Sequence, residues 1–214
     1  MFPFPIATPQ GCNIQTFYGF GTNVGNRSQR TWNKPVGVSH VYIMLIGAGG
    51  NGDDASNGGG SGAVTVWYGA AQHIPNLVYV VATGQGSQHP SQIYFDQGQV
   101  YVLLTAECGV GSTGGAATAS NKFAASGFYK STAGQNAAGT QTASTTTFLG
   151  GGGSNAITGN YGYTVSDNKT GFFQMQPIIV GVGTSAGGAN AGVGCGAGYS
   201  TTGGGQGMVL IASW

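Results

Sequence analysis

The chain has 214 residues, and with 40% hydrophobic and 11% aromatic residues it is long and apolar enough to bury a core. Only 5% of its residues are charged, and six Lys and Arg against five Asp and Glu leave a formal net charge of +1. This composition excludes nucleic acid as a partner, because clustered Lys and Arg carry the affinity for phosphate. An almost uncharged surface gives copies little mutual repulsion, so we expect a homo-oligomer, with a trimer as one arrangement.

The N-terminal segment, residues 1–16, has neither the positively charged start nor the apolar stretch of a signal peptide. No run in the chain approaches 18 apolar residues, so we expect no membrane insertion. The segment opens with Phe2-Pro3-Phe4-Pro5, in which proline keeps the backbone extended and phenylalanine offers anchors. We therefore expect residues 1–16 to dock the protein onto a partner, and residues 17–214 to form a single glycine-rich β domain.

Short segments rich in Val, Ile, Leu and Tyr, with Gly, Pro or Asn at their edges, predict β-strands along the chain. These segments are 38–46, 63–68, 77–82, 92–95, 100–106, 177–182 and 208–213. Within residues 92–104, Asp96-Gln97-Gly98 separates two strand-like halves and predicts a hairpin turn. Apolar residues never recur at helical spacing without interrupting glycines, so we expect essentially no helix. The predicted fold class is all-β, with a sandwich or jelly-roll-like arrangement favoured over a closed barrel.

Glycine, with 43 copies, is about three times as frequent as its usual share of roughly 7%. It concentrates in four runs, at 47–62, 109–119, 150–162 and 181–207. One interpretation of these runs is flexible linker. The other is ordered, extended backbone of polyglycine or polyproline-II type, which stacks against other backbone because no side chain protrudes. The second is favoured because the runs alternate with strands, and the last run leads directly into the apolar strand at 208–213.

The segment 47–52, Gly-Ala-Gly-Gly-Asn-Gly, follows a predicted strand and fits the G-x-G-x-x-G pattern of a dinucleotide-binding turn. That motif needs a helix whose N-terminus holds the pyrophosphate. Residues 53–60, Asp-Asp-Ala-Ser-Asn-Gly-Gly-Gly, cannot form a helix of sufficient length. We therefore expect no nucleotide cofactor here and predict instead that these glycines lie close to other backbone.

Groups that could carry catalysis are few. The carboxylates are Asp53, Asp54, Asp96, Glu107 and Asp167, and the histidines are His40, His73 and His89. The sequence has no H-x-x-x-H pair for a metal and no G-x-S-x-G nucleophile elbow, and the adjacent Asp53 and Asp54 lack the spaced ligands of a calcium loop. Cys12, Cys108 and Cys195 fit neither a disulfide framework nor a metal motif and are expected to be buried fillers. We expect no catalytic residue, no metal and no cofactor, and hence a protein that is not an enzyme.

Aromatic residues crowd the first half of the chain, among many amides and hydroxyls. Core packing is the simpler interpretation. The alternative is a saccharide or protein contact surface, since aromatic rings stack on sugar faces and neutral polar side chains bond to hydroxyls. The candidates for such a recognition surface are Trp67, Tyr68, Tyr94 and Tyr101.

Several motifs occur in a recognisable order. The first are Thr31-Trp32-Asn33-Lys34-Pro35-Val36-Gly37-Val38, a strand ending in Ile46-Gly47-Ala48-Gly49-Gly50, and Gly58-Gly59-Gly60-Ser61-Gly62-Ala63. They are followed by Ile74-Pro75-Asn76-Leu77, and the chain closes with a glycine turn, an apolar strand and Ser213-Trp214. In this order, over residues 16–214, the motifs resemble the glycine-rich domains of bacteriophage virion proteins of the tail-fibre or adhesin-like kind. Residues 116–148 depart from the pattern, being richer in Ala, Ser, Thr and Gln than in Gly, and we expect surface specificity to vary there.

The resemblance implies a non-enzymatic structural protein exposed on the surface of a virion, as a capsid decoration, knob, spike or short fibre subunit. Its partners would be further copies of itself and other virion proteins, and it would be made in the host cytoplasm without a signal peptide. The alternative is a tail-fibre adhesin that attaches to a host-surface glycan. A hydrolase of surface polysaccharide is disfavoured, because glycoside hydrolysis generally uses two carboxylates about 5–10 Å apart and this chain has few carboxylates.

Overall fold

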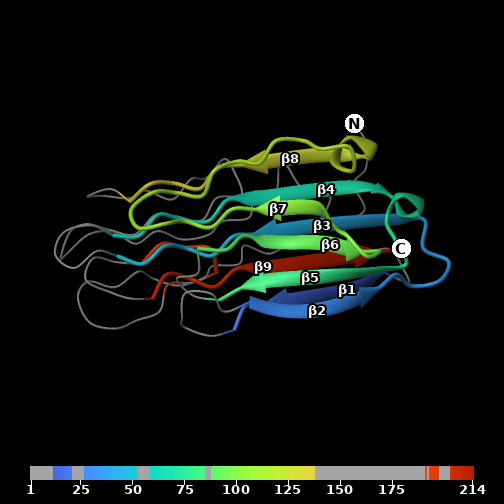
Figure 1. The fold of residues 1–214 in the computed structure, drawn as a ribbon, viewed down its shortest axis with the longest axis horizontal. Helices are drawn as coiled ribbons and strands as arrows, with labels where there is room; N and C mark the ends of the chain where they lie inside the picture. The colour runs from blue at the N-terminus through green and yellow to red at the C-terminus, as the bar shows by residue number, and fades with distance from the viewer. Residues whose placement is uncertain are drawn as a thin grey trace.

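The computed structural model describes residues 12–20, 27–52, 58–84, 88–137, 191, 193–197 and 203–214. In this part of the chain two antiparallel sheets are stacked, with their strands along the long axis of the molecule (Figure 1). The five-stranded sheet has the order β1 (Asn13–Tyr18), β9 (Met208–Ser213), β3 (His40–Ile46), β4 (Val64–Ala70) and β8 (Phe128–Thr132). The four-stranded sheet has the order β2 (Arg27–Asn33), β5 (Leu77–Thr83), β6 (Ser91–Asp96) and β7 (Val100–Ala106). The all-β prediction is confirmed, and the two sheets are consistent with a sandwich.

The central strand β3 is apolar on both faces because both faces are buried. Its residues Val41, Ile43 and Leu45 join the main core cluster, which also contains residues of the four-stranded sheet. Successive side chains of a strand point to opposite faces, so the residues between them, such as Tyr42 and Met44, contribute to a second buried cluster. A continuous apolar run is what a strand covered on both sides requires. The main core therefore lies between the sheets, and a smaller apolar layer lies on the other side of the five-stranded sheet.

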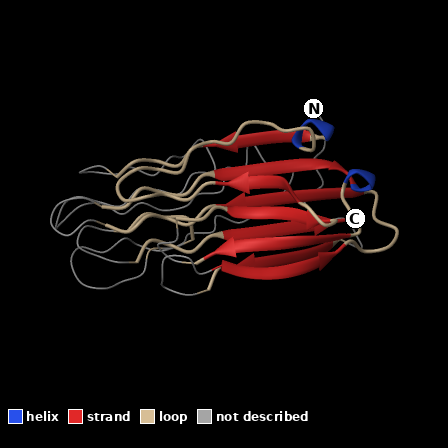
Figure 2. Cartoon of the chain, viewed as in Figure 1, coloured by secondary structure: helices blue, strands red, loops and turns tan. Residues whose placement is uncertain are grey.

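Six predicted strands are confirmed, as β3, β4, β5, β6, β7 and β9, with small shifts at their ends. The strand predicted at 177–182 lies outside the described residues. The sequence did not predict β1, β2 and β8, which are all edge strands of their sheets. An edge strand can present polar residues, as β2 does with its sequence RSQRTWN, and this hides the apolar signal. The helical pieces within the described residues are the two short 3-10 turns η1 (Ala71–His73) and η2 (Ala124–Ser126), shown in Figure 2.

The predicted hairpin between β6 and β7 is confirmed. Gly98 has a φ of +82°, and its amide donates a hydrogen bond to Asp96 Oδ1 at 2.9 Å. The aspartate side chain thus closes the turn, and glycine supplies the left-handed conformation that other residues disfavour. This turn sets the pairing of β6 with β7, on which the candidate site below depends.

Glycine-rich segments continue beyond one end of the strands and lie against one another (Figure 1). The amides of Gly47 and Gly50 both donate to the segment 60–63, whereas Gly49 donates to Gly205. In the same way, the amides at 59 and 62 both donate to the segment 194–197, and those at 60 and 63 both donate to the segment 107–111. Each neighbouring segment is thus reached at every third residue, whereas the two sides of a β-strand alternate with a period of two.

The same segments approach one another too closely for side chains. A Cβ atom placed on Gly49 would meet the carbonyl of Cys195, and one placed on Gly62 would meet the carbonyl of Gly47, in both cases closer than the 3.0 Å that real Cβ atoms keep. Only glycine permits such backbone contact. Gly47, Gly49 and Gly50 therefore lie close to other backbone, as their sequence context predicts.

The N-terminal boundary of the domain differs from the prediction. Residues 13–16, assigned to the docking segment, are part of β1, where they pair with residues 210–213 of β9. The sheet thus begins at Asn13, and the proposed docking residues Phe2, Pro3, Phe4 and Pro5 lie outside the described residues.

Candidate functional site

The four aromatic residues predicted to form a recognition surface do not lie together. Trp67 is fully buried in the main core, where its ring stacks on Phe123 at 4.9 Å between centroids, so its assignment to the surface is wrong. Tyr68, its neighbour in β4, lies on the other face of the sheet and stacks against Trp214 and His40 at 5.8 and 5.7 Å. The alternation of a β-strand separates two adjacent aromatic residues in this way.

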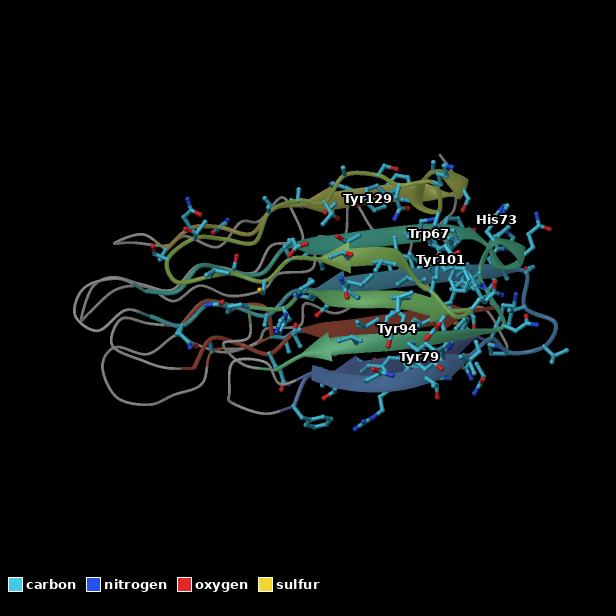
Figure 3. The ribbon with its side chains drawn as sticks, in the orientation of Figure 1. Trp67, His73, Tyr79, Tyr94, Tyr101 and Tyr129 are labelled. Carbon is cyan, nitrogen blue, oxygen red and sulfur yellow. The ribbon has the colours of Figure 1, made fainter. Side chains whose placement is uncertain are left out.

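Tyr94 and Tyr101 lie on the hairpin of β6 and β7, but in different environments. Tyr94 stacks on Tyr79 of β5, with ring centroids 5.1 Å apart, and Figure 3 shows the two labelled rings next to each other. Tyr101 is 47% exposed and stacks on Phe95, which packs against the main core. The structure thus joins Tyr94 to a residue the sequence had not singled out, Tyr79, rather than to Tyr101.

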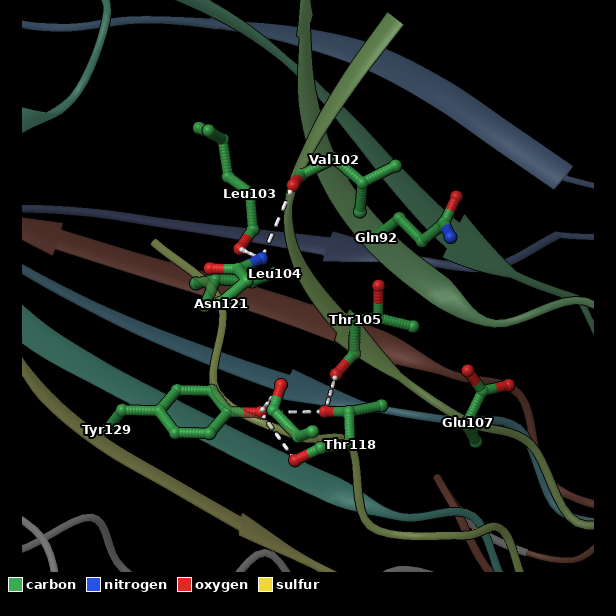
Figure 4. Close-up of a pocket in the computed structure, with 10 residues that line it drawn as sticks. Gln92, Val102, Leu103, Leu104, Thr105, Glu107, Thr118, Asn121 and Tyr129 are labelled. Carbon is green, nitrogen blue, oxygen red and sulfur yellow. Dashed lines mark hydrogen bonds between the residues drawn. The ribbon is translucent and has the colours of Figure 1, made fainter. Parts of the chain in front are cut away.

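A cavity of about 270 Å³ lies where β6 and β7 meet the segment that follows β7 (Figure 4). The register of the hairpin pairs Gln92 with Thr105 and Tyr94 with Val102, and Gln92, Thr105 and Val102 line the cavity, whereas Tyr94 does not. The described residues that line it are Gln92, Val102, Leu103, Leu104, Thr105, Glu107, Thr118, Ala119, Asn121 and Tyr129.

One wall of the cavity is held by side chains that bond to the backbone of the edge strand β7. Asn121 Nδ2 donates to the carbonyl of Leu103 at 2.9 Å, and Thr118 Oγ1 donates to the carbonyl of Thr105 at 3.0 Å. Tyr129, from β8, donates its hydroxyl to the carbonyl of Thr118 at 2.9 Å (Figure 4). These bonds fasten residues 118–121, which we call the strap, over the edge of the sheet, and they occupy carbonyls that could otherwise pair with a foreign strand.

The opposite wall carries three polar side chains that are not used in this way. The Gln92 amide, the Thr105 hydroxyl and the Glu107 carboxylate make no side-chain hydrogen bond or ion pair to any residue that the structure describes. Partial burial raises the pKa of Glu107 above its ordinary value. Together with burial, this carboxylate also raises the pKa of the adjacent Cys108, to about 11. The cavity therefore offers one partly buried acceptor, the Glu107 carboxylate, beside two neutral groups that both donate and accept.

Among the described residues of the lining, Glu107 is the only carboxylate, whereas glycoside hydrolysis generally uses two. Among the described residues no three His, Cys, Asp or Glu side chains are grouped as metal ligands. The same part of the chain contains no helix long and apolar enough to cross a membrane.

The histidines, cysteines and aspartates named in the sequence analysis do not form a common site among the described residues. Of the histidines, His73 lies exposed in η1, and His40 contacts Ser39 at 2.9 Å between Nδ1 and Oγ. The cysteines Cys108 and Cys195 are buried, as expected, and Cys12 is partly buried. Asp53, Asp54 and Asp167 lie outside the described residues.

Sequence reasoning missed the cavity, because the strand pairing that forms it does not follow from the position of the turn. Counting outward from the turn at Asp96-Gln97-Gly98 places β6 opposite β7, but a register shift between Ile93 and Tyr94 changes which residues pair beyond it. Only the shifted register sets Gln92 opposite Thr105, so a simple count from the turn pairs Gln92 with the wrong residue.

Compared with known proteins, the chain matches no protein-family model and no curated protein. The resemblance to phage virion domains therefore rests on the order of the motifs in this sequence.

Proposed function

We propose that this protein is a non-enzymatic structural protein on the surface of a bacteriophage virion, as a capsid decoration, knob, spike or short fibre subunit. The observation that carries the proposal is the contact of backbone with backbone among the glycine-rich segments beyond the strands. In the part of the chain that the structure describes, such packing extends the sandwich with a rod of closely packed backbone. A rod of this kind suits a protein whose task is to hold a shape at the surface of a particle.

The three-residue period of the hydrogen bonds supports a polyproline-II-like conformation for these segments. That helix has three residues per turn and no internal hydrogen bonds, so every amide and carbonyl is available to a neighbour. Residues 59–63 donate in turn to three different segments, which include 107–111 and 194–197. Each segment is thereby tied on several sides, and the loss of chain entropy that glycine brings is offset by these bonds.

The low charge supports an assembled state. With six basic and five acidic residues in 214, long-range repulsion between copies is weak. We expect a homo-oligomer, in contact with other virion proteins, made in the host cytoplasm and incorporated into the particle.

The test is the composition of purified particles. Particles of the phage that encodes this chain are purified by density gradient, analysed by mass spectrometry, and labelled with gold-coupled antibody raised against the full chain. The expected result is several copies per particle and label on the outer surface. Absence of the chain from purified particles, with the protein found only in the lysate, would overturn the proposal.

The N-terminal segment offers a second test of incorporation. Since residues 13–16 belong to β1, the deletion that spares the sheet removes residues 2–12 only. We expect this deletion to reduce incorporation about tenfold or more while the thermal unfolding midpoint stays within about 2 °C, because it leaves every strand that the structure describes in place. Unchanged incorporation would show that Phe2-Pro3-Phe4-Pro5 is not the docking peptide.

A second candidate function is attachment to a host-surface glycan. It is favoured by the cavity between β7 and the strap, where the polar side chains of Gln92, Thr105 and Glu107 line the same space as the apolar side chain of Val102. The two functions are compatible, since an adhesin is also a surface protein of the virion.

A further inference from the structure

The cavity between β7 and the strap has polar groups whose donors and acceptors are left for a ligand. Gln92 and Thr105 lie opposite each other in neighbouring strands, and Glu107 directly follows the last residue of β7, so all three line the cavity from the side of the β6–β7 hairpin. None of the three side chains is engaged with another described residue. A ligand that fits must donate to a carboxylate and both donate to and accept from an amide and a hydroxyl.

The charge of the site narrows the ligand class. Glu107 repels an anion, because no Lys or Arg lines the cavity to balance it. The described lining is a poor ligand set for a metal cation, since a hard cation such as Ca²⁺ takes six to eight oxygen ligands and these residues include one carboxylate. Neutral molecules rich in hydroxyls satisfy the whole set, because each hydroxyl can donate and accept.

Size and apolar contacts narrow the class further. A volume of about 270 Å³ lies just under the range of roughly 300–1,000 Å³ found for drug-sized ligands, which leaves room for one small ring. Val102, 41% exposed, and Ala119 line the cavity and give it an apolar surface. An apolar surface next to hydroxyl-binding groups matches a pyranose, which has an apolar C–H face and a polar rim.

The strap makes the site rigid before any ligand arrives. The Thr118 hydroxyl and the Asn121 amide hold the strap on β7, and the Tyr129 hydroxyl ties it to β8. A wall fixed in this way lowers the cost of ordering on binding. The polar side chains of the strap wall therefore hold the structure, whereas Gln92, Thr105 and Glu107 on the opposite wall make no side-chain hydrogen bond to a described residue.

From these observations we propose that the cavity binds one residue of a neutral saccharide, with Glu107, Gln92 and Thr105 bonding to its hydroxyls and Val102 contacting its apolar face. The inference deepens the second candidate function, glycan attachment, and rests on it. It assigns that function to the β7 edge of the four-stranded sheet, where the strap lies.

The experiment measures binding of defined sugars to the full chain. The probes are the methyl glycosides of glucose, galactose, mannose and N-acetylglucosamine, with saturation-transfer-difference NMR and titration as the readout, followed by an array of neutral oligosaccharides. We expect at least one probe to bind, and Gln92→Ala and Glu107→Gln each to weaken it about tenfold, as for the loss of one hydrogen bond in a desolvated site.

Gln29→Ala is the matched control. Gln29 lies in the same row of the same sheet, since it pairs with Val81, which pairs with Gln92, but it is two strands away from the cavity. This variant should bind as the parent does, and all variants should unfold within about 2 °C of the parent. No binding of any probe or array glycan, or binding that Gln92→Ala and Glu107→Gln leave unchanged, would overturn the inference.

The outcome is separable from that of the particle analysis. A chain that is present on virions but binds no sugar refutes the saccharide site and leaves the structural role intact. A chain that binds sugar through Glu107 and Gln92 but is absent from particles refutes the virion role alone.

Discussion

The two ends of this molecule are built on opposite packing rules. In the sandwich, side chains such as Ile43 and Trp67 fill the space between sheets. In the glycine-rich part, backbone fills the space itself, with Gly49 against Cys195 and Gly62 against Gly47. A core of side chains can adjust to a lost methyl group by repacking, whereas carbonyls already in contact cannot move aside for a gained one. The same small change in volume should therefore have different consequences at the two ends.

The largest effect is expected from Trp67→Ala, which empties the side-chain core. Trp67 is fully buried and supports Phe123 and the turn η2, and its ring fills the space over Gly69 and Gly127. We expect a loss of about 4 kcal/mol in the free energy of unfolding, measured by chemical denaturation. Trp67→Phe should cost clearly less, because it retains a ring to stack on Phe123. A loss below about 1 kcal/mol for the alanine variant would contradict the assignment of Trp67 to the core.

Gly49→Ala tests the backbone-packed end. The added methyl group meets the Cys195 carbonyl, which is held by the amide of Gly205. We expect a loss of about 3 kcal/mol, measured by the same denaturation. Ile43→Val, the removal of one methyl group from the other end, should cost only about 1 kcal/mol. If Gly49→Ala were the milder of the two, the contrast between the ends would be wrong.

Ser91→Ala tests the contact of β6 with the end of β3, where the sandwich meets the glycine-rich segments. Ser91, the first residue of β6, is fully buried, donates to the Ile46 carbonyl at 2.9 Å and pairs with Thr83 Oγ1 at 2.9 Å. Removing this hydroxyl leaves buried partners unsatisfied, so a loss of about 1–2 kcal/mol is expected. The exposed Ser120 is the control, and Ser120→Ala should change the midpoint of unfolding little.

The smallest effect concerns the pH dependence contributed by Glu107. Burial raises the pKa of Glu107 in the folded protein above its value in the unfolded chain. At pH values between these two pKa values the folded state binds more protons than the unfolded state, so the free energy of unfolding falls as pH rises through this range. The Glu107→Gln variant has no carboxylate to ionise at this position, so its stability does not fall in this way as pH rises. We expect the difference in unfolding midpoint between Glu107→Gln and the parent to grow as pH rises from 4 to above the folded pKa and then to level off. A difference that is constant with pH would show that the carboxylate is not desolvated in the folded protein.

The candidate site was harder to predict than the fold. Apolar strands such as β3 and β9 were evident from composition, because they are buried on both faces and admit few polar residues. The polar edge strands β1, β2 and β8 were missed, since their pairing partners, rather than their own residues, specify them. Trp67 and Tyr68 show the same limit at the level of one residue, because adjacent aromatic residues point to opposite faces and only one of them is in the core.

The sequence by itself determined the class of the protein: a β fold with little charge, strands of Val, Ile, Leu and Tyr, and glycine where nothing may protrude. These features follow from local chemistry, since side-chain branching, turn geometry and the missing Cβ act over a few residues. The tertiary structure alone decided which strands share a sheet, and it brought Gln92, Thr105 and Glu107 to one side of a cavity whose other side is the strap. The reason is physical: the register shift in the hairpin and the docking of residues 118–121 on β7 depend on contacts between segments.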